Sequence, residues 1–178
     1  MNSARLEIRA ATGTDREAIW EIFHAVIASG DTYPFDPRMP REDAMAYWFA
    51  PGTNSYVAEL DCLKQSSSAA GRRIVGSYLL KSNQGGAGSH VANAAFIVSS
   101  NARGQGVGRA MGEHCLAEAR RLGFSAMQFN FVVSTNESAV HLWQQLGFNT
   151  VGTLPGAFRH PEKGYVDVYV MFRSLIDD

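Results

Sequence analysis

Apolar residues recur along this chain at two different spacings, and the changes from one to the other predict where its elements lie. Residues 6–10 alternate apolar and polar side chains, which predicts a short strand. Over 19–27 the apolar positions return every three or four residues, which predicts a helix whose end is marked by Gly30. Thr14 and Glu17 have the spacing of a capping box at the start of that helix.

The rest of the chain continues this alternation of strands and helices. Five further segments are predicted to be strands: 55–60, 73–80, 91–98, 127–132 and 166–172. Helical spacing is found in three further segments: 40–50, 106–122 and 139–146. The apolar stripe of the second of these helices is expected to consist of Val107, Met111, Cys115, Leu116 and Leu122.

Two loops are also predicted, and no linker divides the chain into separate domains. The proline-containing segment 33–37 is predicted to be an ordered loop, and the serine- and alanine-rich segment 65–71 a flexible one. Neither a repeat nor a linker interrupts the order of elements. We therefore expect one α/β domain over residues 1–178.

Composition narrows the class of protein further. The 178 residues are 46% hydrophobic and 19% charged, which is typical of a globular domain with a core of its own. Sixteen basic and seventeen acidic residues leave a net charge of −1, which argues against broad electrostatic binding to nucleic acid or an anionic membrane. Cys62 and Cys115 have no partner spacing, so neither a disulfide framework nor a metal site is expected. The N-terminus lacks the apolar segment of a signal peptide and no apolar run approaches ~18 residues, so we expect a soluble, cytoplasmic protein.

The segment 96–109 carries the strongest chemical signal. An apolar strand end is followed by a short loop with alternating glycines and then by an amphipathic helix; the glycines are Gly104, Gly106 and Gly108. The first N–H groups of a helix have no intrahelical partner, so such a junction favours a phosphate or pyrophosphate. Arg103 and Arg109 add positive charge at its rim. A P-loop lysine is absent, and Arg109 stands where a dinucleotide fingerprint requires glycine, which leaves a simple tight turn as the alternative.

Two motifs in this sequence resemble those of a known family. The spacing Arg103-x-x-Gly106-x-Gly108 resembles the Q/R-x-x-G-x-G/A acyl-CoA signature of the GNAT (GCN5-related) N-acetyltransferase superfamily. The run from Asn136 to Phe148, NESAVHLWQQLGF, resembles that family's second signature, N-x-x-A-x-x-L-Y-x-x-x-G-F. A narrower likeness, to the fungal azetidine-2-carboxylate (proline-analogue) acetyltransferases, lies in 90–93, 129–130, 135–136 and 108–114.

The resemblance implies the GNAT fold, a mixed central β-sheet flanked by helices, in which two splayed parallel strands form the acetyl-CoA cleft. The backbone of Phe96 and Val98 would then pair with the pantetheine arm, and an amide near Phe96 would polarise the thioester carbonyl. N–H groups of the glycine loop would hold the pyrophosphate. The implied cofactor-binding residues are Phe96, Ile97, Val98, Arg103, Gly104, Gln105, Gly106, Val107, Gly108, Arg109 and Asn136. No metal is implied.

The resemblance also implies direct attack of a free amine on the thioester, with Asn136 as the catalytic residue that reaches the CoA arm or its sulfur. As an alternative, Asn136 is simply a helix N-cap. Trp143 stands where many relatives have the tyrosine that protonates the departing thiolate, and an indole N–H is no proton source, so that role is not carried over. By residue type the candidate general bases are His90, His114, His141 and Asp167, but the preferred account is deprotonation through water or an amine that is already partly neutral.

The acceptor is expected to be a small-molecule amine, most plausibly an amino or imino acid. Asn93, Asn130 and Phe131 are the implied acceptor-binding residues, because neutral amides can hold a substrate carboxylate without a competing charge. An aromatic set, Tyr33, Phe35, Tyr47 and Trp48, either walls the acceptor side or belongs to the core. Alternatives are an enzyme for protein lysines or N-termini and a non-catalytic acyl-CoA sensor. Whether the protein is a monomer or a homodimer stays open.

Overall fold

A seven-stranded sheet organises the computed structural model, which describes residues 5–61 and 71–176. The strands lie in the order β1-β2-β3-β4-β5-β7-β6. Their bounds are β1 (Leu6–Ala10), β2 (Asn54–Asp61), β3 (Arg72–Ser82), β4 (Val91–Val98), β5 (Ala126–Val133), β6 (Asn149–His160) and β7 (Gly164–Ser174). The predicted flexible loop, save for Gly71, and Cys62 lie outside the described residues.

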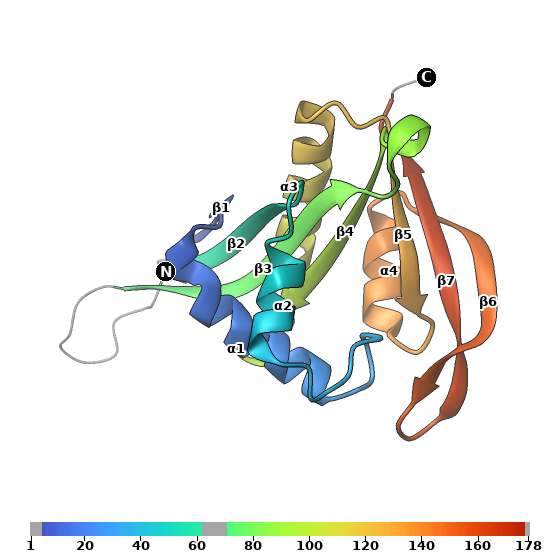
Figure 1. The fold of residues 1–178 in the computed structure, drawn as a ribbon, viewed down its shortest axis with the longest axis horizontal. Coiled ribbons are helices and arrows are strands. Elements are labelled where there is room, and N and C mark those ends of the chain that lie inside the picture. Colours follow the sequence, from blue (N-terminus) through green and yellow to red (C-terminus); the bar gives the residue numbers. More distant parts are fainter. Residues whose placement is uncertain (1–4, 62–70, 177–178) are drawn as a thin grey trace.

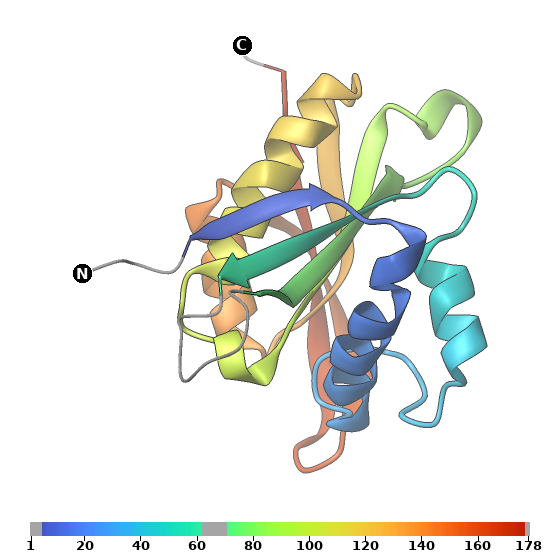
Figure 2. The ribbon, with the colours of Figure 1, turned by 90° about the vertical axis from the view of Figure 1, so that its left-hand side faces the viewer.

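Within the described residues, four α-helices cover the two faces of this sheet (Figures 1 and 2). They are α1 (Arg16–Ala28), α2 (Arg41–Trp48), α3 (Val107–Arg121) and α4 (Glu137–Gln145). Side chains alternate between faces along each strand, so neighbouring residues enter different cores. Val57, Leu79 and Ile97 pack with α1 and α2, whereas Tyr78 packs with α3 and α4. Short 3₁₀ turns span Gly13–Asp15, Gly86–Gly88 and Ser100–Ala102.

The strands β4 and β5 separate soon after they begin. They form the one parallel pair among the described strands, and its register joins only Val91 to Ala126 and Ala92 to Met127. On its other side β5 pairs with β7 from Ala126 to Val133, with a break in register between Phe129 and Val132. The expected mixed sheet with a splayed parallel pair is therefore present, and Figure 1 shows the two strands diverging.

Several predicted element boundaries are confirmed, but three other predictions are wrong: a capping pair, one residue of an apolar stripe and an omitted strand. The capping pair before α1 is Thr12 and Asp15, not Thr14 and Glu17, because the Asp15 carboxylate accepts the Thr12 N–H at 2.6 Å. Gly30 ends the α1 region with φ +65°, a conformation that favours glycine. Leu122 is 37% exposed and is not part of the apolar stripe of α3.

The third error is the omission of β6. This strand is mostly exposed at the edge of the sheet, so its residues do not alternate between apolar and polar. It contains Pro155 and two glycines, and its register with β7 breaks between Leu154 and Phe158. Proline is tolerated at an edge or a bulge because no ladder hydrogen bond is lost there.

In the described ranges no helix is both long and apolar enough to cross a membrane.

Candidate active site

Two adjoining cavities open where β4 and β5 separate. The larger has a volume of about 670 Å³ and the smaller about 240 Å³. The two cavities share six of their lining residues: Thr32, Tyr33, Phe96, Asn136, Ala139 and Trp143. A ligand in one cavity therefore meets a ligand in the other at this shared wall, beside the splayed strands.

The glycine loop forms one end of the larger cavity. Gly104 and Gly106 have φ values of +74° and +79°, and no heavy atom lies within 4 Å of a Cβ built on either. Glycine is therefore needed for the backbone conformation, and the space above the loop is open. Gly106 is the N-cap of α3, so the N–H groups of the first helical turn point into this open space.

Nearly all of the predicted cofactor-binding residues lie in the larger cavity. Those that line it are Phe96, Ile97, Val98, Arg103, Gly104, Gly106, Val107, Gly108, Arg109 and Asn136. Gln105 is not among them, because its side chain turns back and donates to the Asn101 carbonyl at 2.8 Å. The Arg109 guanidinium contacts Glu113 and Gln145, which holds it along α3 and α4 at the rim.

The larger cavity is also lined by residues that the sequence did not predict. They are His160, Glu162 and Lys163, at the turn between β6 and β7. Thr135 also lines it, and the Thr135 hydroxyl is buried without a hydrogen-bond partner among the described residues. An unpartnered buried hydroxyl is costly, so a polar ligand group here would satisfy it.

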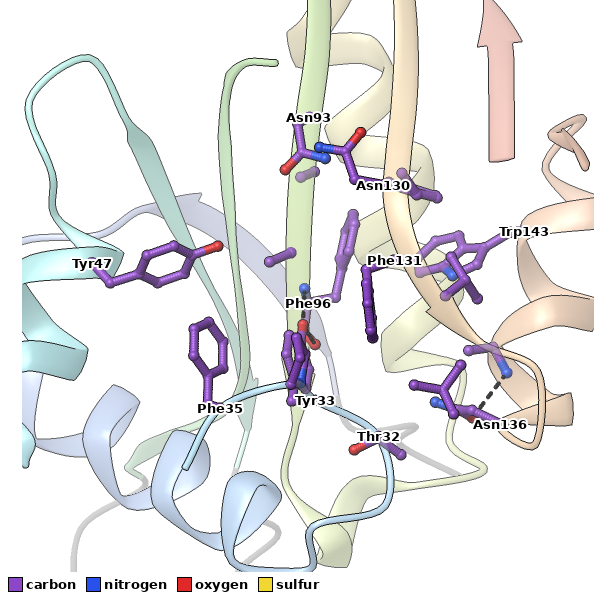
Figure 3. A pocket seen from close by; sticks show the side chains of 17 residues that line it. Thr32, Tyr33, Phe35, Tyr47, Asn93, Phe96, Asn130, Phe131, Asn136 and Trp143 are labelled. Atoms are coloured by element: carbon purple, nitrogen blue, oxygen red, sulfur yellow. Dashed lines mark hydrogen bonds between the residues drawn. The ribbon is translucent and has the colours of Figure 1, made fainter. Parts of the chain in front are cut away.

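Tyr33 occupies the shared wall between the two cavities (Figure 3). Its hydroxyl donates to the Phe96 carbonyl at 2.7 Å and accepts the Phe96 N–H at 2.9 Å. Burial raises the pKa of the Tyr33 hydroxyl well above its ordinary value, so it stays protonated. The backbone groups of Phe96 that were expected to face a ligand are thus bonded to this side chain.

Asn136 is the N-cap of α4 and also lines both cavities. Its side-chain oxygen accepts the Ala139 N–H at 3.3 Å and the Ser138 hydroxyl at 3.1 Å, so it caps α4. It also lines both cavities. Trp143, about two turns along the same helix, packs against Phe96 and Phe129 with ring centroids 4.8 and 4.7 Å from its own.

The smaller cavity is walled by amides and aromatic rings (Figure 3). Asn93 donates to the Gln128 carbonyl at 2.8 Å and so bridges β4 and β5 just beyond their last paired residues. Asn130 accepts from the Gln128 side chain at 2.8 Å and donates to Asn83 at 2.6 Å. Both asparagines line the cavity, as does Phe131.

Asn130 and Phe131 face this cavity because of the break in register of β5, which frees them from pairing with β7. Of the aromatic set, Tyr33, Phe35 and Tyr47 line the cavity. Trp48 does not, because it is fully buried and donates to the Ser77 hydroxyl at 2.9 Å.

The candidate general bases lie elsewhere. His90, His114, His141 and Asp167 line neither cavity, and within the described ranges no carboxylate or imidazole lines the smaller one. The His114 ring bonds to the Tyr78 hydroxyl at 2.6 Å, and burial lowers its pKa. The same ranges contain no group of three His, Cys, Asp or Glu residues that could hold a metal ion.

Comparison with known proteins identifies the family. Residues 18–148 match the model of the acetyltransferase (GNAT) family. This chain belongs to the GNAT family. As a GNAT enzyme it is an N-acetyltransferase that uses acetyl-CoA as co-substrate.

Named relatives agree with this assignment. The chain is 34% identical over 161 residues to the N-acetyltransferase aca1 of Schizosaccharomyces pombe, covering 85% of this chain and 77% of that protein. It is 41% identical to a GCN5-related N-acetyltransferase from Kribbella flavida, with a TM-score of 0.86 over 95% of this chain and 97% of the other. A Salmonella typhimurium protein solved with acetyl-CoA shares the GNAT fold at 21% identity, with a TM-score of 0.78 over 98% and 96% of the two chains.

Proposed function

We propose that this GNAT enzyme acetylates the amine of a small molecule, namely an amino or imino acid, and that residues 1–178 form one catalytic domain. The observation that carries the proposal is the smaller cavity, which adjoins the larger one at Tyr33, Phe96 and Asn136. Its volume of about 240 Å³ equals that of about eight water molecules at ~30 Å³ each, which suits a free amino acid.

The fold by itself does not decide the acceptor. A structure described as a phosphinothricin N-acetyltransferase shares it at 23% identity, with a TM-score of 0.80 over 97% of this chain and all of the other. A ribosomal-protein-alanine N-acetyltransferase from Brucella melitensis shares it at 20% identity, with a TM-score of 0.76 over 94% and 99%. The choice between a free acid and a protein therefore rests on the cavity.

The neutral amides support a carboxylate-bearing acceptor. Asn93 and Asn130 each have one hydrogen bond from Nδ2, to Gln128 and Asn83 respectively. An amide nitrogen carries two hydrogens, so each side chain retains one for a substrate carboxylate. Phe131 offers an apolar surface for a ring or side chain. This environment is consistent with the proline-analogue branch of the family, which we retain as part of the proposal.

In the larger cavity we assign the pyrophosphate to the N–H groups at the start of α3, with Arg103 and Arg109 at the rim. Val98 and Phe96 present backbone groups to the ligand arm. When bound, acetyl-CoA supplies an acyl group that is already activated as a thioester. Holding the amine beside it in the adjoining cavity provides much of the rate acceleration.

Deprotonation of the amine is assigned to water, and stabilisation of the departing thiolate to a hydrogen bond from Asn136. The smaller cavity has no base among the described residues, so the amine loses its proton to solvent. Asn136 faces both cavities and is placed to donate to the departing sulfur. A thiol has a pKa near ~8.5, so departure as a thiolate needs no strong acid, and Trp143 is required only for packing.

A panel of acceptors tests the proposal. Thiol release from acetyl-CoA is measured with azetidine-2-carboxylate, hydroxyproline isomers, primary amino acids and lysine peptides, each at equal amine concentration. We expect release with free amino or imino acids and little with peptides. Release with peptides alone would reassign the enzyme to protein substrates, and release with no amine would favour the sensor.

A further inference from the structure

Tyr33 is the residue at which three cavities meet. Besides the two already described, a third cavity of about 420 Å³ lies between the loop after α1 and the strand β6. Pro34, Phe35, Phe131 and Phe158 are among its walls, and Tyr33 is the one described residue that lines all three. Its ring stacks on Phe35 with centroids 5.7 Å apart, so the loop presents it firmly to β4.

The two backbone groups that Tyr33 bonds would normally pair with a neighbouring strand. Ile97 lies opposite Ser77, and Ser99 donates to Val75, so the odd-numbered residues at this end of β4 bond to β3. Phe96 therefore directs its N–H and carbonyl away from β3, toward the gap that β5 leaves. The Tyr33 hydroxyl fills the place of the missing strand by accepting from one group and donating to the other.

The proposed function assigns these same two groups to acetyl-CoA, and one N–H cannot donate fully to both. We propose that Tyr33 is a positioning residue that holds the Phe96 backbone pair in the free enzyme and is displaced from it by acetyl-CoA. The inference rests on the proposed place of the ligand arm along β4. The Tyr33 side chain lines both cavities, and rotation about its Cα–Cβ bond is the movement that takes the hydroxyl away from Phe96.

Such a competition weakens the apparent affinity for acetyl-CoA. If the state with Tyr33 bonded to Phe96 is populated about ten to one over the open state, the apparent dissociation constant rises about tenfold. Removing the hydroxyl should therefore tighten binding by about that factor. General damage to the site would weaken binding, so the direction of the change separates the two explanations.

The test is titration calorimetry with acetyl-CoA on the full chain, comparing wild type with Tyr33→Phe. Tyr33→Leu, which also lacks the hydroxyl, provides a second variant. Tyr56→Phe is the matched control, because it loses a hydrogen bond of 2.6 Å to Glu118 but lines neither cavity of the site. Adenosine 3′,5′-bisphosphate, which lacks the pantetheine arm, is the second probe.

We expect both Tyr33 variants to bind acetyl-CoA about tenfold more tightly, with unchanged affinity for the bisphosphate and no change in Tyr56→Phe. Equal or weaker acetyl-CoA binding by folded Tyr33 variants overturns the proposal. Failure of the proposed ligand site itself is recognised separately, because acetyl-CoA affinity would then also be insensitive to Gly106→Glu.

Discussion

Replacing Gly106 by glutamate tests the assignment of the pyrophosphate to the glycine loop. Gly106 and Gly123 flank the two ends of α3, with φ values of +79° and +85°, and neither has an atom within 4 Å of a built Cβ. A side chain at either position therefore costs about 1–2 kcal/mol of backbone strain and meets no steric obstacle. Gly123→Glu is thus a matched control for Gly106→Glu.

The two variants differ in how the new charge interacts with α3. A carboxylate at the N-terminal end of a helix is stabilising by about 0.3–1 kcal/mol, and at the C-terminal end it is destabilising by a similar amount. Gly106→Glu should therefore be the more stable of the two variants. At about 2–4 °C per kcal/mol for a chain of this size, it should melt a few degrees above Gly123→Glu.

Binding should show the opposite order. A carboxylate about 5 Å from a doubly charged pyrophosphate costs about 1.7 kcal/mol in water and about four times as much at an effective dielectric constant of 20. Gly106→Glu should therefore weaken acetyl-CoA binding by at least about fifteenfold, measured by titration calorimetry. Gly123→Glu should bind as the wild type does. A folded Gly106→Glu variant with affinity within about threefold of wild type would refute the assignment.

Three further predictions concern catalysis, acceptor binding and stability. Asn136→Ala should lower kcat more than it changes the amine KM. Asn136→Ser keeps a favoured N-cap, so it should restore the stability of the protein but not kcat. Recovery of kcat by the serine variant would show that Asn136 acts only as a helix cap. Asn93→Ala removes a hydrogen bond to the charged carboxylate of the amine substrate, worth ~1.5–3 kcal/mol, so the KM for the amine should rise roughly ten- to a hundredfold. The KM for acetyl-CoA should change far less. An unchanged KM for the amine would contradict the assignment of Asn93 to the acceptor site. Asp15 is held by Arg9 at 2.8 and 2.9 Å, which lowers the pKa of its carboxyl from 3.8 to about 2. Its stabilisation of about 2 kcal/mol is present above about pH 4 and lost as the pH falls toward 2, so the unfolding free energies of wild type and Asp15→Asn should converge over that range. Asp36→Asn is the control, because Asp36 is also bonded to an arginine, Arg38, but in an exposed ion pair that contributes little, so its curve should converge with that of wild type far less.

The elements that could be predicted from sequence are those whose signals are local. The strand β4, the glycine loop and α3 follow one another within 91–121, so hydrophobic spacing and glycine positions sufficed to place them. Asn136 was recognisable as a cap, because capping depends on the next three positions, whereas its assignment to the site came from the family resemblance. The order of strands and the splay are consistent with the family resemblance.

The features that could not be predicted from sequence depend on contacts between distant segments of the chain or on the exposure of a strand to solvent. The hydrogen bonds between Tyr33 and Phe96 join residues 63 positions apart, and no local pattern marks them. The strand β6 lies exposed at a sheet edge, so its hydropathy carries no strand period, and with it the contribution of Lys163 to the larger cavity was missed. Trp48 could not be assigned to core or cavity until its bond to Ser77 was known.

A crystal structure of the dead-end complex with CoA and azetidine-2-carboxylate tests the central claim most directly, namely that the two adjoining cavities receive the two substrates. We predict the pyrophosphate over residues 104–109, the thiol beside Phe96 and Asn136, and the acceptor in the smaller cavity with its carboxylate at Asn93 and Asn130. An acceptor bound outside the smaller cavity, or CoA lying away from the gap between β4 and β5, would contradict the account.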